Sequence, residues 1–133
     1  MFSPKAAFSG FSVNDLGQAK EFYTETLGLT VTDGVGGTRI QLPGGSQAWM
    51  YPAKDHAPAT YTMLDFVVDD IDEAVDELTS RGVRFERYEG IPQDDRGILR
   101  GQEKGMGPNI AWFKDPAGNI LAVLETDYVA EVG

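Results

Sequence analysis

Few residues in this chain could do chemistry, and their types narrow the kind of site. Among its 133 residues are no cysteine and a single histidine, His56. Thiolate metal sites, cysteine nucleophiles and a facial triad of two histidines and a carboxylate are therefore excluded. We expect His56, in a proline-containing connection, to lie at the surface. Asp65 differs, because it interrupts an apolar run, where a carboxylate is costly unless paired, hydrated or facing a cation.

The segments expected to form the surrounding strands and helices occur as an internal sequence repeat. Residues 8–16, shifted by 55 positions, fall on residues 63–71, so that Asp15 falls on Asp70. Each aspartate follows a strand-like run and is a good N-cap for a helix, which Gly28 or Gly82 then ends. Two copies of one unit predict a pseudo-symmetric domain with its ligand held between two similar halves.

The remaining pattern is strand-like. Shifted by 73 positions, Pro43 falls on Pro116 and Gly45 on Gly118, so the last hairpin repeats an earlier one. We predict a single α+β domain over residues 1–133, built from two βαβββ modules that form a curled mixed sheet around a cleft. The modules span about 6–51 and 61–126, with a linker at 52–60 and a tail at 127–133. Predicted strands are 6–13, 29–32, 38–42, 47–51, 61–68, 83–86, 110–114 and 120–124.

Between the matched parts of the second half lies a polar, glycine-rich stretch, residues 87–109. Structureless segments of this length are uncommon in compact domains and are often functional. Two interpretations stay open: a lid over a binding site, or a surface excursion with a short strand at 97–100.

Charge and composition limit the partners. The chain carries 21 acidic and 11 basic residues, a formal charge of −10. That balance argues against nucleic acid and anionic membranes, which need clustered cations. It is compatible with a cationic ligand, or simply with solubility. With no apparent signal peptide and no long apolar run, we expect a cytoplasmic protein.

Three segments together resemble the vicinal oxygen chelate superfamily of glyoxalases, bleomycin-resistance proteins and extradiol dioxygenases. They are NDLGQAKEFYTETLGL (14–29), VDDIDEAVDELTSRGV (68–83) and AWFKDPAGNILAVLE (111–125). The resemblance implies the glyoxalase/bleomycin-resistance-like fold, commonly a homodimer. It also implies four strand positions that supply metal ligands in metal-dependent members. Those positions are Phe8, Trp49, Met63 and Ala122 here, none of which offers the oxygen or nitrogen donor expected. We therefore expect a member without a metal or other cofactor.

Strand alternation assigns side chains to the cleft. We predict that it is aromatic and apolar with a few polar groups, as small-molecule sites tend to be. The predicted ligand-binding residues are Phe8, Trp49, Tyr51, Met63, Asp65, Trp112 and Ala122. Trp112 and its neighbour Phe113 compete for this face, because the parity of their strand is ambiguous. The same residues could instead be plain core.

The favoured function is that of a small-molecule binding protein holding an aromatic or cationic ligand, an antibiotic being one example. No catalytic residue is assigned. A metal-dependent lyase or dioxygenase is the main alternative, and metal-free acid–base chemistry using Asp65 with Tyr51 or Tyr61 is a third. Fold alone does not choose among them.

Overall fold

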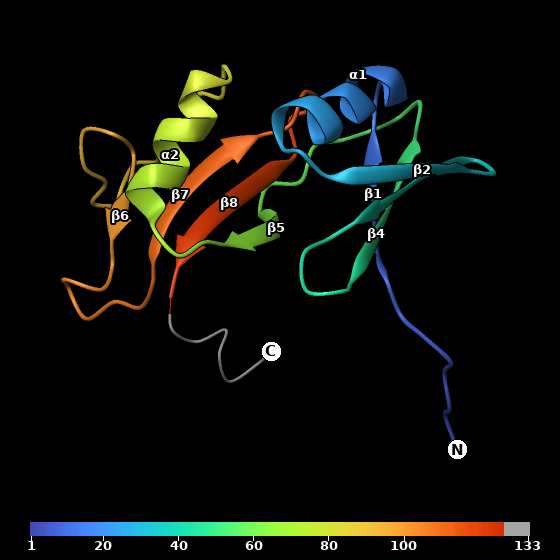
Figure 1. The fold of residues 1–133 in the computed structure, drawn as a ribbon, viewed down its shortest axis with the longest axis horizontal. Coiled ribbons are helices and arrows are strands. Elements are labelled where there is room, and N and C mark those ends of the chain that lie inside the picture. Colours follow the sequence, from blue (N-terminus) through green and yellow to red (C-terminus); the bar gives the residue numbers. More distant parts are fainter. Residues whose placement is uncertain (127–133) are drawn as a thin grey trace. The chain divides into compact units, whose positions relative to one another are not determined.

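The structure is a computed structural model that describes residues 1–126 (Figure 1). Its first module has one helical segment and four strands. The elements are β1 (Ser9–Val13), α1 (Leu16–Glu21), the π-helical turn η1 (Phe22–Thr26), β2 (Thr30–Gly34), β3 (Gly37–Gln41) and β4 (Gln47–Pro52). The strands form a mixed sheet in the order β1-β4-β3-β2, with β1 parallel to β4 and the other pairs antiparallel.

The second module repeats that arrangement. Its elements are β5 (Thr62–Val67), α2 (Ile71–Ser80), β6 (Leu99–Arg100), β7 (Asn109–Lys114) and β8 (Ile120–Glu125). They form a second mixed sheet, in the order β5-β8-β7-β6, with β5 parallel to β8. The predicted α+β fold of two βαβββ modules is confirmed, with the hydrogen bonding divided between two four-stranded sheets.

The repeated aspartates begin the two helices as predicted. The Asp15 carboxylate accepts the backbone N–H of Gln18, and that of Asp70 accepts the backbone N–H of Glu73. Each bond satisfies a donor that a helix start leaves unpaired. At the other end of each helical segment stands a glycine with positive φ, 72° at Gly28 and 94° at Gly82.

The turn in the motif DPAGN is held by its own side chains. Asp115 is buried, and its Oδ1 accepts the backbone N–H groups of Ala117 and Asn119. The side-chain amide of Asn119 donates to Asp115 Oδ2. These bonds fix the β7–β8 hairpin and explain why an aspartate and an asparagine occur at its two ends.

Two predicted boundaries differ from the structure. Residues 83–86 form no regular strand, although Glu86 N–H donates to the carbonyl of Trp112 at the edge of β7. The fourth strand of this sheet is instead the short β6, close to the strand predicted at 97–100. Pro52, assigned to the linker, ends β4, and the chain divides into two compact units after Ala57. The predicted tail, 127–133, lies outside the described residues.

No helix within residues 1–126 has the length and apolar character needed to cross a membrane.

Candidate functional site

Each sheet has one face packed on its helical segment and one face turned away from it, here called the helix-free face. On β1, the Phe11 ring packs 5.8 Å from that of Tyr23, and Val13 is fully buried. On β7, Phe113 is fully buried, whereas its neighbour Trp112 is half-buried. Because side chains alternate along a strand, Gly10 and Trp112 belong to the helix-free faces. The ambiguity between Trp112 and Phe113 is thereby resolved.

Strand register aligns equivalent residues of the two modules. In the first, Gly10 pairs with Trp49 and Trp49 with Arg39. In the second, Asp65 pairs with Ala122 and Ala122 with Trp112. The offsets of 55 and 73 positions seen in the sequence carry Gly10 onto Asp65, Trp49 onto Ala122 and Arg39 onto Trp112. The repeat seen in the sequence is therefore also a repeat in the structure.

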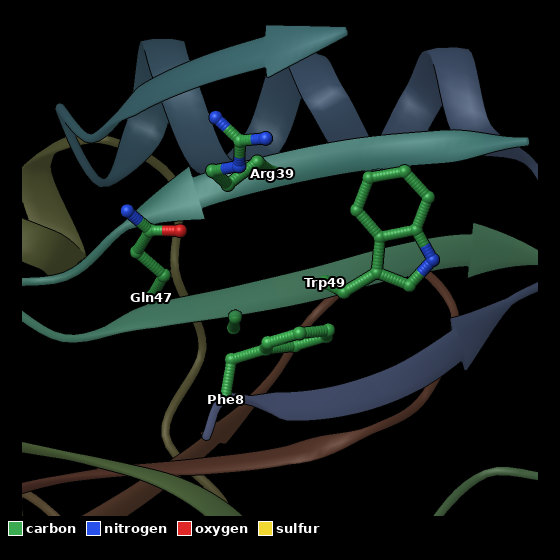
Figure 2. A pocket seen from close by; sticks show the side chains of 5 residues that line it. Phe8, Arg39, Gln47 and Trp49 are labelled. Atoms are coloured by element: carbon green, nitrogen blue, oxygen red, sulfur yellow. The ribbon is translucent and has the colours of Figure 1, made fainter. Parts of the chain in front are cut away.

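A pocket of about 330 Å³ opens on the first row (Figure 2). Its lining comes from the residue just before β1 and from β3 and β4, and consists of Phe8, Arg39, Gln47, Ala48 and Trp49. Figure 2 shows the rings of Phe8 and Trp49 and the polar ends of Arg39 and Gln47 around it. A volume of this size suits a small molecule, and two aromatic walls suit a planar one.

Two glycines set the position of the Trp49 ring. Gly34 and Gly37 pair across the β2–β3 hairpin. A Cβ on Gly37 would lie 2.5 Å from the Met50 carbonyl oxygen and 2.7 Å from Cζ2 of Trp49, and one on Gly34 would lie 3.0 Å from Cη2. The indole therefore occupies the space that the missing side chains leave.

Arg39 brings a cation to this pocket. Its side chain is exposed, and it takes part in none of the ion pairs formed among residues 1–126. Asp33, on the same hairpin, faces the other side of the sheet, where it binds Lys20, Nζ to Oδ1 2.8 Å, and accepts a bond from Thr38. The hydrogen bond from Lys20 lowers the pKa of Asp33, which is consistent with that engagement. The Arg39 guanidinium is left with its donors available.

The second row carries the opposite charge. Asp65 is exposed, and partial burial of its carboxyl raises its pKa. Its neighbour Ala122 is fully buried, while Trp112 is half-buried with its ring 5.7 Å from that of Tyr88 in an edge-to-face arrangement. The Tyr88 hydroxyl is buried without a hydrogen-bond partner among the described residues, and burial raises its pKa.

The predicted site residues thus fall into two groups, one in each module. Phe8 and Trp49 line the pocket, and Tyr51 lies two residues further along β4, 39 % exposed. The other group is in the second module: Asp65, Ala122 and Trp112 in one row, with Met63 at the bulge between Thr62 and Leu64.

The predicted ligand-binding residues did not include Arg39 or Gln47, although alternation along the strand of Trp49 places Gln47 on the same face. The signal for Arg39 was present, because the 73-residue offset carries Trp112 back to it.

His56 corrects another expectation. It is half-buried rather than on the surface, and its Nδ1 lies 2.7 Å from Oγ of Ser12 on β1. Its position could not be read from the sequence, since residues 12 and 56 meet only through the packing of the connection after β4.

The charged part of the 87–109 segment is fastened to α2. Arg100 bonds both Asp72 and Asp94, and Arg96 bonds Asp72 and Asp76. The hydrogen bond from Arg100 lowers the pKa of Asp72. These pairs hold residues 94–100 beside the helix, which favours the interpretation as a surface excursion with a short strand over the lid.

The sequence model of the Glyoxalase/Bleomycin resistance protein/Dioxygenase superfamily matches residues 7–123. The chain belongs to this superfamily. No curated protein matches it.

Solved structures with this fold cover almost the whole chain. FosX, a fosfomycin resistance protein from Listeria monocytogenes, superposes with a TM-score of 0.67 at 15 % identity, covering 94 % of each chain. TnmS3, an antibiotic binding protein from Streptomyces sp. CB03234, gives 0.62 at 24 % identity, covering 95 % of this chain and 100 % of its own. Lactoylglutathione lyase from Agrobacterium tumefaciens gives 0.62 at 21 % identity, covering 92 % and 94 %. At these identities the likeness shows the fold alone.

The positions that supply metal ligands in metal-dependent members of this glyoxalase superfamily can be tested on the structure. Phe8 and Trp49 present rings to the pocket, and Ala122 is buried. Met63 offers a single thioether, a soft ligand that binds weakly alone. Within residues 1–126, no three histidine, cysteine, aspartate or glutamate side chains gather into a group that could hold a metal ion. The residues present do not fit a metal centre.

Proposed function

We propose that this superfamily member is a metal-independent small-molecule binding protein whose ligand inserts a planar aromatic group between Phe8 and Trp49. The observation that carries the proposal is the pocket of about 330 Å³ walled by those two rings. Aromatic side chains give large contact areas and favour stacked or edge-to-face partners. The antibiotic binding protein TnmS3 has this fold, so an aromatic antibiotic is one candidate ligand.

The sequence pointed to an aromatic or a cationic ligand, and the pocket supports the aromatic half of that expectation. Its charged lining residue is Arg39, whereas Asp65 belongs to the second module. A cation would therefore meet repulsion at this pocket. Asp65 remains a proposed anchor for a basic group at its own row.

The test uses the two tryptophans of the chain. Trp112→Phe leaves Trp49 as the single emitter, and a library of aromatic metabolites and antibiotics is then titrated while Trp49 fluorescence is followed. We expect binders to change the emission and to raise the melting temperature. Trp49→Ala should abolish the thermal shift, whereas Phe2→Ala, which removes a ring that is 89 % exposed, should leave it intact. A thermal shift unaffected by Trp49→Ala would place the ligand elsewhere.

Metal-dependent lyase or dioxygenase activity is the competing function. Elemental analysis of protein purified without chelators distinguishes the two. We expect no stoichiometric transition metal, because the ligand positions hold Phe8, Trp49, Met63 and Ala122. Near-stoichiometric zinc, nickel, manganese or iron would overturn metal independence.

A homodimer is also proposed, on the family resemblance. Sedimentation velocity at micromolar concentration should give a species of twice the 14.5 kDa chain mass. A monomer at all concentrations would contradict it.

A further inference from the structure

Building on the proposed function, we infer that the aromatic ligand carries an oxyanion, a carboxylate or phosphonate, and that Arg39 selects for it. The site is the guanidinium on the pocket wall formed by β3, between the aromatic wall and the Gln47 amide (Figure 2).

Arg39 differs from most arginines of the chain in its charge pairing. This is an acidic chain, with 21 acidic and 11 basic side chains, so a cation has many possible intramolecular partners. Four of the six arginines have one: Arg81, Arg87, Arg96 and Arg100 all bond to oxygen acceptors. Arg39 has none within residues 1–126, and the acid on its hairpin, Asp33, lies on the opposite face of the sheet, where it binds Thr38 and Lys20. An arginine that lines a pocket and has no intramolecular acceptor keeps its donors free to bind what enters.

The geometry of the Arg39 side chain and its neighbours suits an oxyanion attached to an aromatic ring. A guanidinium presents a planar fork of N–H donors that matches a carboxylate or phosphonate with two parallel hydrogen bonds. Strand register places Arg39 directly opposite Trp49, so an anion at the guanidinium leaves its attached ring beside the indole. Gln47, two residues before Trp49 on β4, offers an amide donor to the same group. The lining therefore matches an aromatic acid better than a neutral or basic ring.

Selectivity follows from the electrostatics. A charge-assisted hydrogen bond contributes more than a neutral one, and a partly enclosed pocket screens it less than open water does. An aromatic acid should therefore bind more tightly than its amide, and its affinity should fall as salt is raised.

The experiment compares four probes by isothermal titration calorimetry: 2-naphthoate, 2-naphthylphosphonate, neutral 2-naphthamide and cationic 2-naphthylmethylamine. We expect both anions to bind at least about tenfold more tightly than the amide, and the amine to be weakest. Arg39→Gln should weaken the anions by roughly tenfold to a hundredfold while leaving the amide within about twofold. Preference between the two anions then distinguishes a carboxylate from a phosphonate ligand.

The matched control is Arg84→Gln. Arg84 is also exposed and also lacks an intramolecular acceptor among residues 1–126, but it lies in the second module, outside this pocket. Arg84→Gln removes the same charge as Arg39→Gln. Unchanged anion affinity in Arg84→Gln would therefore show that the effect of Arg39→Gln is local. Equal losses in both variants would reduce the effect to net charge and overturn the inference. Melting temperatures within about 2 °C of the parent verify that both variants fold, as expected for exposed side chains.

Two failures can be told apart. If all four probes bind equally and depend on Trp49 but not on Arg39, the anion preference is wrong and the aromatic pocket stands. If none of the four binds, the proposed function falls, and the inference with it.

Discussion

The two modules distribute bulk in opposite ways at equivalent positions. In the first, Gly34 and Gly37 stand beside a tryptophan, Trp49. In the second, the register-equivalent residues are Leu99, Ile110 and Ala122. Large and small residues have exchanged places around one backbone geometry. Two consequences follow: Ala122 is fully buried, whereas Trp49 is only half-buried and lines a pocket.

Charge is exchanged as well. The first row holds the cation Arg39 where the second holds Trp112, and the second row holds Asp65 where the first holds Gly10. A duplicated scaffold thus presents different chemistry in each copy. Similar folds with different side chains at the same row positions are what allow one superfamily to serve many functions.

The largest expected effect tests the glycine requirement. Gly37→Ala places a methyl group 2.5 Å from the Met50 carbonyl oxygen and 2.7 Å from the Trp49 ring, so strand or indole must move. We expect a loss of about 2 kcal/mol in the free energy of unfolding, measured in urea, together with a shift in Trp49 emission.

Gly10→Ala is the matched control on the same face, since its new methyl would meet only the Trp49 carbonyl oxygen, at 3.7 Å. It should be nearly neutral. Equal stability of the two variants would show that the exchange of bulk does not constrain Trp49.

A smaller effect tests the fastening of residues 94–100. Arg100→Gln removes bonds to Asp72 and Asp94, whose side chains with that of Arg100 are 26–47 % exposed, so we expect a loss of about 1 kcal/mol. Lys20→Gln in the first module breaks one pair with Asp33, an acid 68 % exposed, and should cost less. Urea unfolding of both variants at pH 7 compares them, and an equal cost would mean that the network adds nothing.

Acidic pH should remove the contribution of the Arg100–Asp72–Asp94 ion pairs to the free energy of unfolding. The hydrogen bond from Arg100 lowers the pKa of Asp72 below its ordinary value of 3.8, so folding keeps this carboxylate charged. Its stabilisation is complete above pH 3.8 and is lost as pH falls through the lowered value. The stability gap between the parent and Arg100→Gln should therefore close in that acidic window. Melting curves that stay parallel down to pH 2 would contradict the assignment.

The smallest effect concerns Asp65. Partial burial raises its pKa above 3.8, so the folded state binds this proton more tightly than the unfolded state. Its ionisation then costs stability as pH rises through the raised pKa. Asp65→Asn should melt slightly higher than the parent at pH 7, with the difference disappearing at pH 3. Gly10→Asp, the equivalent change in the first module, asks whether the charge is tolerated there too. A lower melting temperature for Asp65→Asn would indicate a bound or paired carboxylate.

Much of this could be predicted from the sequence because it is local. Asp15 and Asp70 indicate where the two helices begin, and the motif DPAGN indicates a hairpin, each through hydrogen bonds made within a few residues. Gly28 and Gly82 indicate where the helical segments end. Alternation along a strand then assigned Trp49 and Asp65 to the helix-free faces, and the repeat offsets correctly identified equivalent positions. Residues 83–86 were misassigned because alternation of apolar and charged residues does not reveal whether a partner strand is available.

What only the tertiary structure decided depends on contacts between distant segments. The pocket requires β1, β3 and β4 to meet, and the position of the Trp49 ring depends on Gly34 and Gly37, 15 and 12 residues away along the chain. The unpaired state of Arg39 became visible only from the ion pairs formed among residues 1–126, in none of which it takes part. Sequence by itself determined the fold, because turns, caps and alternation are written locally. It left open the chemistry of the site, because charge pairing and cavity shape arise from side chains that the fold brings together.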